Sequence, residues 1–306
     1  MKLPSIDVIR LRHAAAKAMR EFFCEQEIWE VDTPVRIPAP AAELHIVAEP
    51  AGTQYLRTSP ELHMKRMLAA GAKAIYQLGP CFRANECGSR HRPEFSMLEW
   101  YRRDVDYMAI LADIQSLIPH IAHAIQDCMP ALSQNASSPF VPAALAKPWD
   151  VYTIREIYCQ RAGWDPVVDF DPDRFDLDMI NIIEPSLPKN RFTILTDYPI
   201  QVAALARRKA NDPRVAERWE LYGGGLELAN AFSELTDPTE QRIRFEEALI
   251  RKKEIGEPIY SLDEHFLSAL EKGLPPCAGV ALGFDRLLMA LTNAQDIAEV
   301  LPFPNK

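Results

Sequence analysis

A run of basic residues near position 90 is the first part of the sequence that could do chemistry. Residues 82–103 read FRANECGSRHRPEFSMLEWYRR, and the loop-like part of this run holds Arg83, Arg90, His91 and Arg92. A guanidinium is permanently charged and offers a planar set of N–H donors, so several of them around one loop suit a polyphosphate. The alternative is a solvated loop whose arginines pair with nearby glutamates, an arrangement that stabilises a protein only slightly.

Two glutamates form a second candidate site. Glu227 and Glu234 lie seven residues apart in YGGGLELANAFSEL. In a straight strand this odd separation places them on opposite faces, and in a helix it places them roughly 10 Å apart along the axis. A chain reversal near Asn230 and Ala231 would bring both carboxylates to one Mg²⁺, which commonly binds carboxylates together with substrate phosphates. The alternative is that both are ordinary surface groups.

A third candidate, Arg286, follows the small-residue segment AGVALGF. We expect a strand that turns at Gly283 into a helix beginning near Asp285, which places Arg286 in the first helical turn. A cation there is unfavourable unless an anion lies nearby, so Arg286 indicates an anion site. A salt bridge with Asp285 or another carboxylate is the alternative. Together the three features favour a site for ATP and Mg²⁺ more than any one of them does.

The elements that must position these residues follow from the pattern of apolar and turn-forming residues. The basic run lies between YQLGPCF and FSMLEWYR, which predicts two strands joined by a long loop. Ser59 and Pro60 begin a helix that has Glu61 in its first turn. At the N-terminus we expect a helix from Ser5 to about Glu27, followed by a strand or extended arm in IWEVDTPVRIP.

Composition and charge limit the class of protein. The 306 residues are 48% hydrophobic and 25% charged, which is ordinary for a globular protein and excludes disordered and fibrous classes. The net charge of -9 offers no general attraction to a nucleic acid, so such a partner would need a local basic patch. Without a signal peptide or a window of 18 apolar residues, we expect a cytoplasmic protein that does not enter the membrane. The six scattered cysteines indicate reduced thiols.

The domain organisation is predicted to be one domain over 1–306 with a variable insertion at about 130–192. Prolines are frequent in the insertion, which also contains the acidic run DFDPDRFDLD. That run lacks the glycine and the glutamate of a calcium loop, which favours a solvated face or turn. No GxxxxGK[ST] motif occurs, so a P-loop fold is not expected.

Three segments resemble the ordered motifs of class II aminoacyl-tRNA synthetases. The helix ending in WEVDTPV resembles motif 1, FR followed by HRPEFSMLEWYR resembles motif 2, and GVALGFDRLLMAL resembles motif 3. TSPELHMKR and LELANAFSEL are similar to the lysine branch. This resemblance implies an α+β fold, the class II aminoacyl-tRNA synthetase catalytic domain, with a mostly antiparallel sheet flanked by helices. It also implies a homodimer formed through the motif 1 helix and arm.

Within that branch, GVALG and MLEWYR are similar to the elongation factor P (R)-β-lysine ligase family, and Ala281 stands where lysyl-tRNA synthetases usually have glycine. The chain starts directly at the motif 1 helix, so we expect no anticodon-binding domain and no tRNA partner. The resemblance implies an AMP-forming ligase that uses ATP to activate β-lysine, releases pyrophosphate and transfers the acyl group to a lysine ε-amino group of translation elongation factor P. The alternatives are a truncated lysyl-tRNA synthetase-like or free amino-acid ligase, and a non-catalytic regulatory paralogue that binds ATP or lysine.

The resemblance also implies residue roles. Arg83 would hold the α-phosphate and Arg286 the γ-phosphate, and both are the expected catalytic residues. Glu227 and Glu234 would bind Mg²⁺. The nucleotide site would further include Ala84, Asn85, Arg92, Glu227, Leu228 and Gly283. The amino-acid site would consist of Ser59, Glu61, Tyr101, Glu234 and Ala281.

The sequence departs from the family pattern at three places. Asn85 and Glu86 occupy positions where the synthetases read NE in the order FRNE, so the adenine-contacting glutamate is shifted or replaced. Arg92 replaces the usual asparagine after the histidine. Ala231 stands where the family mostly has glycine, so a turn with positive φ there would have to form at Asn230 or differ in shape.

Overall fold

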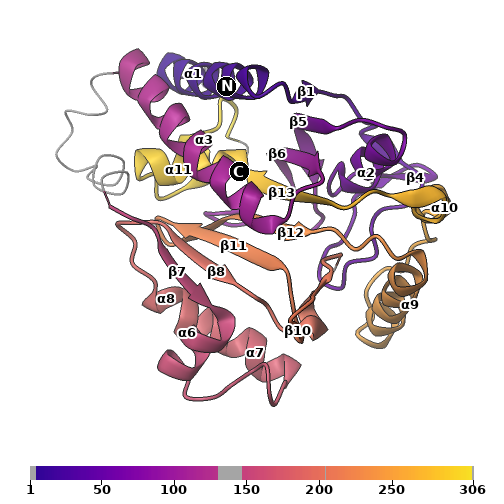
Figure 1. The fold of residues 1–306 in the computed structure, drawn as a ribbon. Coiled ribbons are helices and arrows are strands. Elements are labelled where there is room, and N and C mark those ends of the chain that lie inside the picture. Colours follow the sequence, from indigo (N-terminus) through magenta and orange to yellow (C-terminus); the bar gives the residue numbers. More distant parts are fainter. Residues whose placement is uncertain (1–4, 130–146, 204, 305–306) are drawn as a thin grey trace.

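An eight-stranded sheet forms the centre of the computed structural model, which describes residues 5–129, 147–203 and 205–304. The strand order is β1-β5-β6-β13-β12-β11-β8-β7 (Figure 1). The edge strands β1 (Trp29–Glu30) and β7 (Asp150–Thr153) pair in parallel with their neighbours, and the inner pairs are antiparallel. The predicted α+β fold with a mostly antiparallel sheet is therefore confirmed.

The inner strands carry most of the site. They are β5 (Ala74–Phe82), β6 (Glu94–Arg103), β8 (Thr193–Thr196), β11 (Arg218–Gly223), β12 (Leu226–Ser233) and β13 (Cys277–Gly283). Strands β5 and β6 are paired from Ala74 and Arg102 to Phe82 and Glu94, where the loop that carries the basic run begins. This confirms the predicted pair of strands joined by a long loop.

One face of the sheet is covered by α1 (Ile6–Glu25), α3 (Tyr107–Cys128) and α11 (Phe284–Thr292) (Figure 1). Their apolar sides meet alternate residues of the strands, such as Leu98 and Trp100 of β6, in one large core. The intervening residues, such as Glu99 and Tyr101, therefore point to the opposite face. This alternation places polar side chains such as Glu99 and Tyr101 on the face of the sheet opposite α1, α3 and α11.

Helix α3 is also the one helix, within the described residues, that is long and apolar enough to cross a membrane by length and composition. Its side chains Ile114, Leu117, Ile118 and Ile121 are completely buried in the core. A central position in the fold therefore accounts for its hydropathy.

The other face of the sheet is partly covered by α2 (Glu61–Ala69), α9 (Pro238–Glu254) and α10 (Glu264–Gly273). A small sheet of β2 (Arg36–Ile37), β4 (Gln54–Leu56) and β3 (Pro50–Ala51) lies in the same part of the chain, and residues 38–49 form the loop between β2 and β3. Helix α11 begins at Phe284, directly after β13, which agrees with the predicted turn at Gly283.

The predicted insertion at about 130–192 falls partly outside the described residues, at 130–146. Its described part contains β7, α6 (Ile154–Arg161), α7 (Pro172–Asp178), the π-helix η1 (Met179–Ile183) and α8 (Glu184–Ser186). The acidic run forms α7, and Asp171 caps this helix by accepting a hydrogen bond from Arg174 N. Across the described ranges, no group of three or more His, Cys, Asp or Glu residues has the arrangement of a metal site.

Shorter elements complete the described chain: η2 (Ile200–Val202), the two-stranded sheet of β9 (Arg208–Lys209) and β10 (Asp212–Ala216), and η3 (Ile297–Glu299). Segment η3 lies against the loop of the basic run, because Ile297 N donates to Ser89 O at 2.7 Å.

Candidate active site

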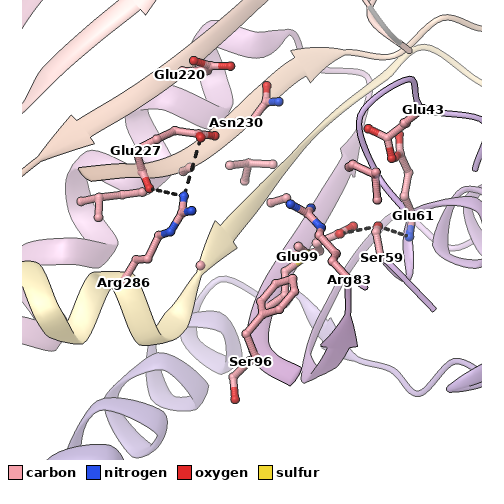
Figure 2. Close-up of a pocket in the computed structure, with 18 of the residues that line it drawn as sticks. Glu43, Ser59, Glu61, Arg83, Ser96, Glu99, Glu220, Glu227, Asn230 and Arg286 are labelled. Atoms are coloured by element: carbon pink, nitrogen blue, oxygen red, sulfur yellow. Dashed lines mark hydrogen bonds and ion pairs between the residues drawn. The ribbon is translucent and has the colours of Figure 1, made fainter. Parts of the chain in front are cut away.

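A cavity of about 530 Å³ opens on the face of the sheet opposite α1 and α3 (Figure 2). Residues from the β5–β6 loop, from β6, β11, β12 and β13, and from the loop 38–49 line it. The lining includes most of the residues predicted from the sequence: Ser59, Glu61, Arg83, Arg92, Tyr101, Glu227, Leu228, Glu234, Ala281, Gly283 and Arg286. Ala84 and Asn85 do not line this cavity.

Small residues of β13 form the floor of the cavity. Gly279 lies opposite Tyr101 of β6, and a Cβ atom at Gly279 would lie only 2.2 Å from Cδ1 of that ring. Ala281 is paired with Glu99 on one side and Asn230 on the other. The small side chains therefore leave room for a ligand above the strand and for Tyr101 at its edge.

Two buried carboxylates share one buried lysine at one end of the cavity. Lys65 Nζ lies 2.6 Å from Glu61 Oε1 and also contacts Glu234 Oε2. Glu234 is only 1% exposed, and its Oε1 atom has no hydrogen-bond partner. Burial raises the pKa of Glu234 to about 8, although the charge of Lys65 opposes this. A buried acceptor without a donor suits a ligand that brings an ammonium group.

Glu99 is a third carboxylate at this end, and the sequence analysis missed it. Ser59 Oγ donates to Glu99 Oε1 at 2.6 Å, and the Tyr101 hydroxyl donates to Glu99 Oε2 at 2.7 Å. Ser59 Oγ also accepts from Glu61 N, which fixes its position at the start of α2. Burial and the nearby charge of Glu61 raise the pKa of Glu99 to about 7. This end of the cavity thus has an excess of negative charge.

Arg83 brings positive charge to the middle of the cavity. Its guanidinium lies over the Phe95 ring, 5.2 Å from the ring centroid, and its Nε atom is buried without a hydrogen-bond partner. The nearest carboxylate in an ion pair with it is Glu86, at 3.7 Å. The alternative of pairing with a nearby glutamate therefore holds for Arg83 at this long distance, while its buried Nε donor remains available to an anion.

Arg286 lies at the far end of the cavity, across from the carboxylates around Lys65 (Figure 2). Its Nη1 atom donates to Glu227 O at 3.0 Å and lies 3.6 Å from Glu227 Oε2. Its Nη2 atom lies 2.5 Å from His91 Nε2. The alternative of a salt bridge with Asp285 or another carboxylate holds for Glu227 and not for Asp285, which pairs with Arg12 at 2.5 Å. Arg286 is therefore held in place by the walls of the cavity.

The loop of the basic run differs from the family pattern at its corner. Asn85 is exposed and has a φ of 67°, a left-handed conformation that asparagine tolerates well. The following residue, Glu86, lines the cavity instead. Arg92 donates to His91 O and Gly88 O and lies 3.4 Å from Asp296. Arg92 thus holds the loop against η3 as well as lining the cavity.

The expected chain reversal near Asn230 is wrong. Strand β12 is continuous from Leu226 to Ser233, and Ala231 is buried within it without a positive φ. Glu227 pairs with Tyr222 and Ala229 pairs with Leu221, so β12 has one extra residue, a bulge, between these two pairs. The extra residue brings Glu227 and Glu234 to the same face of the sheet. An extended strand still separates their Cα atoms by about 20 Å. The two carboxylates cannot bind one Mg²⁺, so the assignment of Glu234 as a shared metal ligand is wrong.

Glu220 of β11 is the better companion for Glu227, and the sequence analysis missed it. Both line the cavity, and Glu220 is among the charges that raise the pKa of Glu227 to about 7, after burial. The hydroxyls of Tyr198 and Tyr222 donate to Glu220 Oε2 at 2.6 and 2.7 Å. The signal was present, since Glu220 and Glu227 flank a GGG turn, and such a turn predicts a hairpin that brings its flanks together.

Two carboxylates on neighbouring strands of one cavity are suited to a magnesium ion that also contacts phosphates. Glu220 and Glu227 meet this condition, and each already has a guanidinium beside it: Arg218 Nη2 lies 2.6 Å from Glu220 Oε1, and Arg286 Nη1 lies 3.6 Å from Glu227 Oε2. Arg286 lies beside Glu227, so the same end of the cavity offers both a metal site and a guanidinium to a polyphosphate. The cavity therefore has Arg286, Glu220 and Glu227 at one end and the carboxylates around Lys65 at the other.

The chain is similar to known proteins over nearly its whole length. A family model described as tRNA synthetases class II (D, K and N) matches residues 4–306. A protein of Mannheimia succiniciproducens named elongation factor P–(R)-β-lysine ligase is 39% identical, over 97% of this chain and 95% of the relative. Proteins of the same name from Proteus mirabilis and Vibrio cholerae are each 37% identical, over 98% and 99% of this chain and 96% and 97% of the relative.

Proposed function

The chain belongs to the class II tRNA synthetase family of the D, K and N type and, within it, to the elongation factor P–(R)-β-lysine ligases; from this premise we propose that it activates (R)-β-lysine with ATP and transfers it to a lysine ε-amino group of elongation factor P. It is accordingly a ligase. The finer steps, the β-lysyl adenylate and the acceptor lysine, are parts of this proposal.

One observation carries the proposal: a single cavity has the guanidinium groups of Arg83 in its middle and Arg286 at one end, and an excess of carboxylates at the other end. Arg83 and Arg286 can bind the phosphates of ATP. Glu99 and Glu234 can bind the ammonium groups of a diamino acid. An amino acid with two ammonium groups and one carboxylate would therefore lie with its carboxylate towards Arg83 and the α-phosphate.

The proposed reaction needs positioning and charge neutralisation more than a protein nucleophile. A carboxylate oxygen of β-lysine attacks the α-phosphorus, the bond from that phosphorus to the bridging oxygen breaks, and pyrophosphate leaves. Arg83 would neutralise the charge that gathers on the α-phosphate, and Arg286 would hold the leaving pyrophosphate. The acceptor lysine amine would then attack the acyl carbon, and AMP would leave with the electron pair of the acyl–oxygen bond.

The proposed nucleotide site has two further parts. Glu220 and Glu227 would hold Mg²⁺, which supplies neutralisation of the phosphate charge. Leu228 and Gly283 would line the space for the nucleotide, with Arg92 at its edge. Glu86 takes the cavity position that the sequence analysis assigned to Asn85. Ala84 does not line the cavity; its N–H donates to Val47 O at 2.8 Å and would fix the loop that carries Arg83.

Some properties of the whole protein belong to the same proposal. We expect a cytoplasmic enzyme with elongation factor P as its protein substrate and without a tRNA substrate. We also expect a homodimer formed through α1 and the arm that follows it, and one catalytic domain with an insertion at about 130–192.

Amino-acid-dependent exchange of labelled pyrophosphate into ATP tests the activation step. We expect exchange that requires Mg²⁺ and is faster with (R)-β-lysine than with α-lysine. Arg83→Ala should reduce the exchange rate by about 10²–10³-fold, the effect of removing one donor to a developing charge. Arg214→Ala is the matched control, because Arg214 is an exposed arginine paired with Asp212 outside the cavity. Exchange that is independent of β-lysine would contradict the proposal.

A further inference from the structure

Glu43 is a carboxylate of the cavity that has no role in the proposed reaction so far. It lies on the loop 38–49 and lines the cavity on the same side as Glu61 (Figure 2), and Glu99 and Glu234 line the same cavity. Its side chain forms no hydrogen bond or ion pair with any residue that the structure describes. The other three are partnered, since Glu61 and Glu234 share Lys65, and Glu99 accepts two hydroxyls.

The loop that carries Glu43 is fixed by bonds to its own backbone. Buried Lys252 of α9 donates from Nζ to Ile46 O at 2.8 Å. Ala48 N donates to the Tyr260 hydroxyl at 2.9 Å, and Ala84 N donates to Val47 O at 2.8 Å. These hydrogen bonds to three successive residues hold this part of the loop against α9, against the segment that follows α9, and against the β5–β6 loop. Glu43 therefore comes from a positioned backbone next to the cavity.

The loop of Glu43 lies beside Arg83, because Val47 of this loop accepts a hydrogen bond from the N–H of Ala84, the residue after Arg83, at 2.8 Å. Burial and the negative charge of Glu61 raise the pKa of Glu43 to about 7. Arg83 is the cation that acts on it most strongly, ahead of Arg218 and Lys65. For Glu234 the strongest cation is Lys65. Glu43 and Arg83 therefore line the cavity from two bonded loops, and Arg83 is where the carboxylate of the amino acid would react, whereas Glu234 lies against Lys65.

An acidic cluster alone would not show a ligand site, but Glu234 adds an independent observation. Its Oε1 atom is buried in the cavity wall without a partner, which indicates a cationic group of a ligand at the distal end. A diamino acid held there by its distal ammonium extends towards Arg83. Its second ammonium group then passes the unpartnered carboxylate of Glu43.

We propose that Glu43 binds the ammonium group nearest the reacting carboxylate of the amino acid, and that it thereby selects diamino acids over acids that carry only the distal amine. This inference rests on the proposed function, because it takes the activated substrate to be a diamino acid. It assigns Glu43 a role in specificity that is separate from the distal site at Glu234.

Binding measurements with Glu43→Gln test the proposal. The ligands are (R)-β-lysine, which has both ammonium groups, and 6-aminohexanoate, which lacks the one near the carboxylate. We expect Glu43→Gln to weaken β-lysine binding by about tenfold to a hundredfold, the usual effect of losing a hydrogen bond to a charged group. The same substitution should leave the affinity for 6-aminohexanoate within about twofold, because that ligand has no group for Glu43. Equal weakening of both ligands, or unchanged binding of β-lysine, would overturn the proposal.

Two further variants keep the test decisive. Glu49→Gln makes the same charge change at an exposed position near the end of the same loop and should bind both ligands as the unchanged protein does. Glu43→Asp keeps the charge and should retain the preference for β-lysine over 6-aminohexanoate even if Glu43→Gln does not fold. Loss of the preference in a folded Glu43→Asp protein would also count against the proposal.

The test separates failure of this proposal from failure of the proposed function. If the unchanged protein does not activate β-lysine, the proposed function fails, and comparison of α-lysine with 6-aminohexanoate still reports on Glu43. If activation occurs but Glu43→Gln weakens both ligands equally, only the role of Glu43 is refuted.

Discussion

Replacing Lys65 with methionine would test whether one buried cation supports the ammonium-binding end. Lys65 is 1% exposed and lies between Glu61 and Glu234, which are themselves buried. Methionine has a similar length but no charge, so Lys65→Met leaves two carboxylates without their counter-ion. Removing one partner of a buried ion pair costs about 3–5 kcal/mol. The pKa of Glu234 is already raised to about 8, so this carboxylate can take up a proton near neutral pH when Lys65 is removed. The loss in the free energy of unfolding should therefore lie near the lower limit of that range, about 3 kcal/mol.

A loss of about 3 kcal/mol should lower the melting temperature by roughly 6–12 °C in a protein of this size. Thermal unfolding followed by circular dichroism measures this change. Lys17→Met is the matched control, because Lys17 and Glu21 form an exposed pair with the same spacing on α1. Such pairs contribute about 0.5 kcal/mol or less, so this variant should melt within about 2 °C of the unchanged protein. If Lys65→Met melts no lower than Lys17→Met, Lys65 does not compensate the buried carboxylates.

Three other outcomes are expected. Arg286→Ala should lower pyrophosphate exchange by about 10²–10³-fold without changing the melting temperature, and near-normal exchange would remove Arg286 from the phosphate site. Glu220→Gln should raise the Mg²⁺ concentration for half-maximal exchange severalfold; an unchanged Mg²⁺ dependence would exclude Glu220 as a ligand. Binding of a diammonium amino acid at pH 7 should release protons, because a nearby cation lowers the raised pKa values of Glu99 and Glu234. Calorimetry in buffers of different ionisation enthalpy measures this release, and heats independent of the buffer would contradict it.

The same carboxyls set the sign of the pH dependence of stability. In the unfolded chain they lose their protons near pH 4.3, whereas the folded protein holds them up to about pH 7 for Glu99 and about pH 8 for Glu234. The folded state binds more protons in this window, so the stabilising contribution present below about pH 4 is lost as the pH rises to 8. Melting temperatures of the ligand-free protein should therefore fall from pH 5.5 to pH 8.5, and a rise would refute the raised pKa values.

The strands and helix starts of the site could be predicted from sequence, because local patterns determine them. Alternation of apolar residues on either side of the basic run predicted β5 and β6, and Gly283 marked the start of α11 within one residue. Most of the residues predicted for the site do line the cavity, since they belong to recognisable motifs. The structure adds the common cavity that brings these distant motifs together.

Other parts depended on strand pairing, which local patterns do not determine. The distance between Glu227 and Glu234 was misjudged because a reversal was assumed where β12 continues through a bulge. Glu220 was missed although the GGG turn predicts its hairpin, because its role depends on the cavity that it shares with Glu227. Asp285 was considered as a salt-bridge partner of Arg286, yet Arg12 binds Asp285 from a distant helix and Arg286 pairs with Glu227.

Glu43 illustrates the same limit. The loop 38–49 has no strong periodic pattern, and its position comes from bonds to Lys252 and Tyr260, more than two hundred residues later in the chain. No local signal in AAELHIVAE shows that Glu43 reaches the cavity, which is formed by motifs far away in the sequence. Such loops are the part of a site for which a structure adds most.

Transfer of labelled (R)-β-lysine tests the central claim most directly. The purified protein would be incubated with ATP, Mg²⁺ and the label, and with either elongation factor P or tRNA. We predict label on elongation factor P, at a lysine whose replacement by arginine abolishes the transfer, and no label on tRNA. Label on tRNA at a comparable rate, or no label on elongation factor P while the amino acid is activated, would contradict the account.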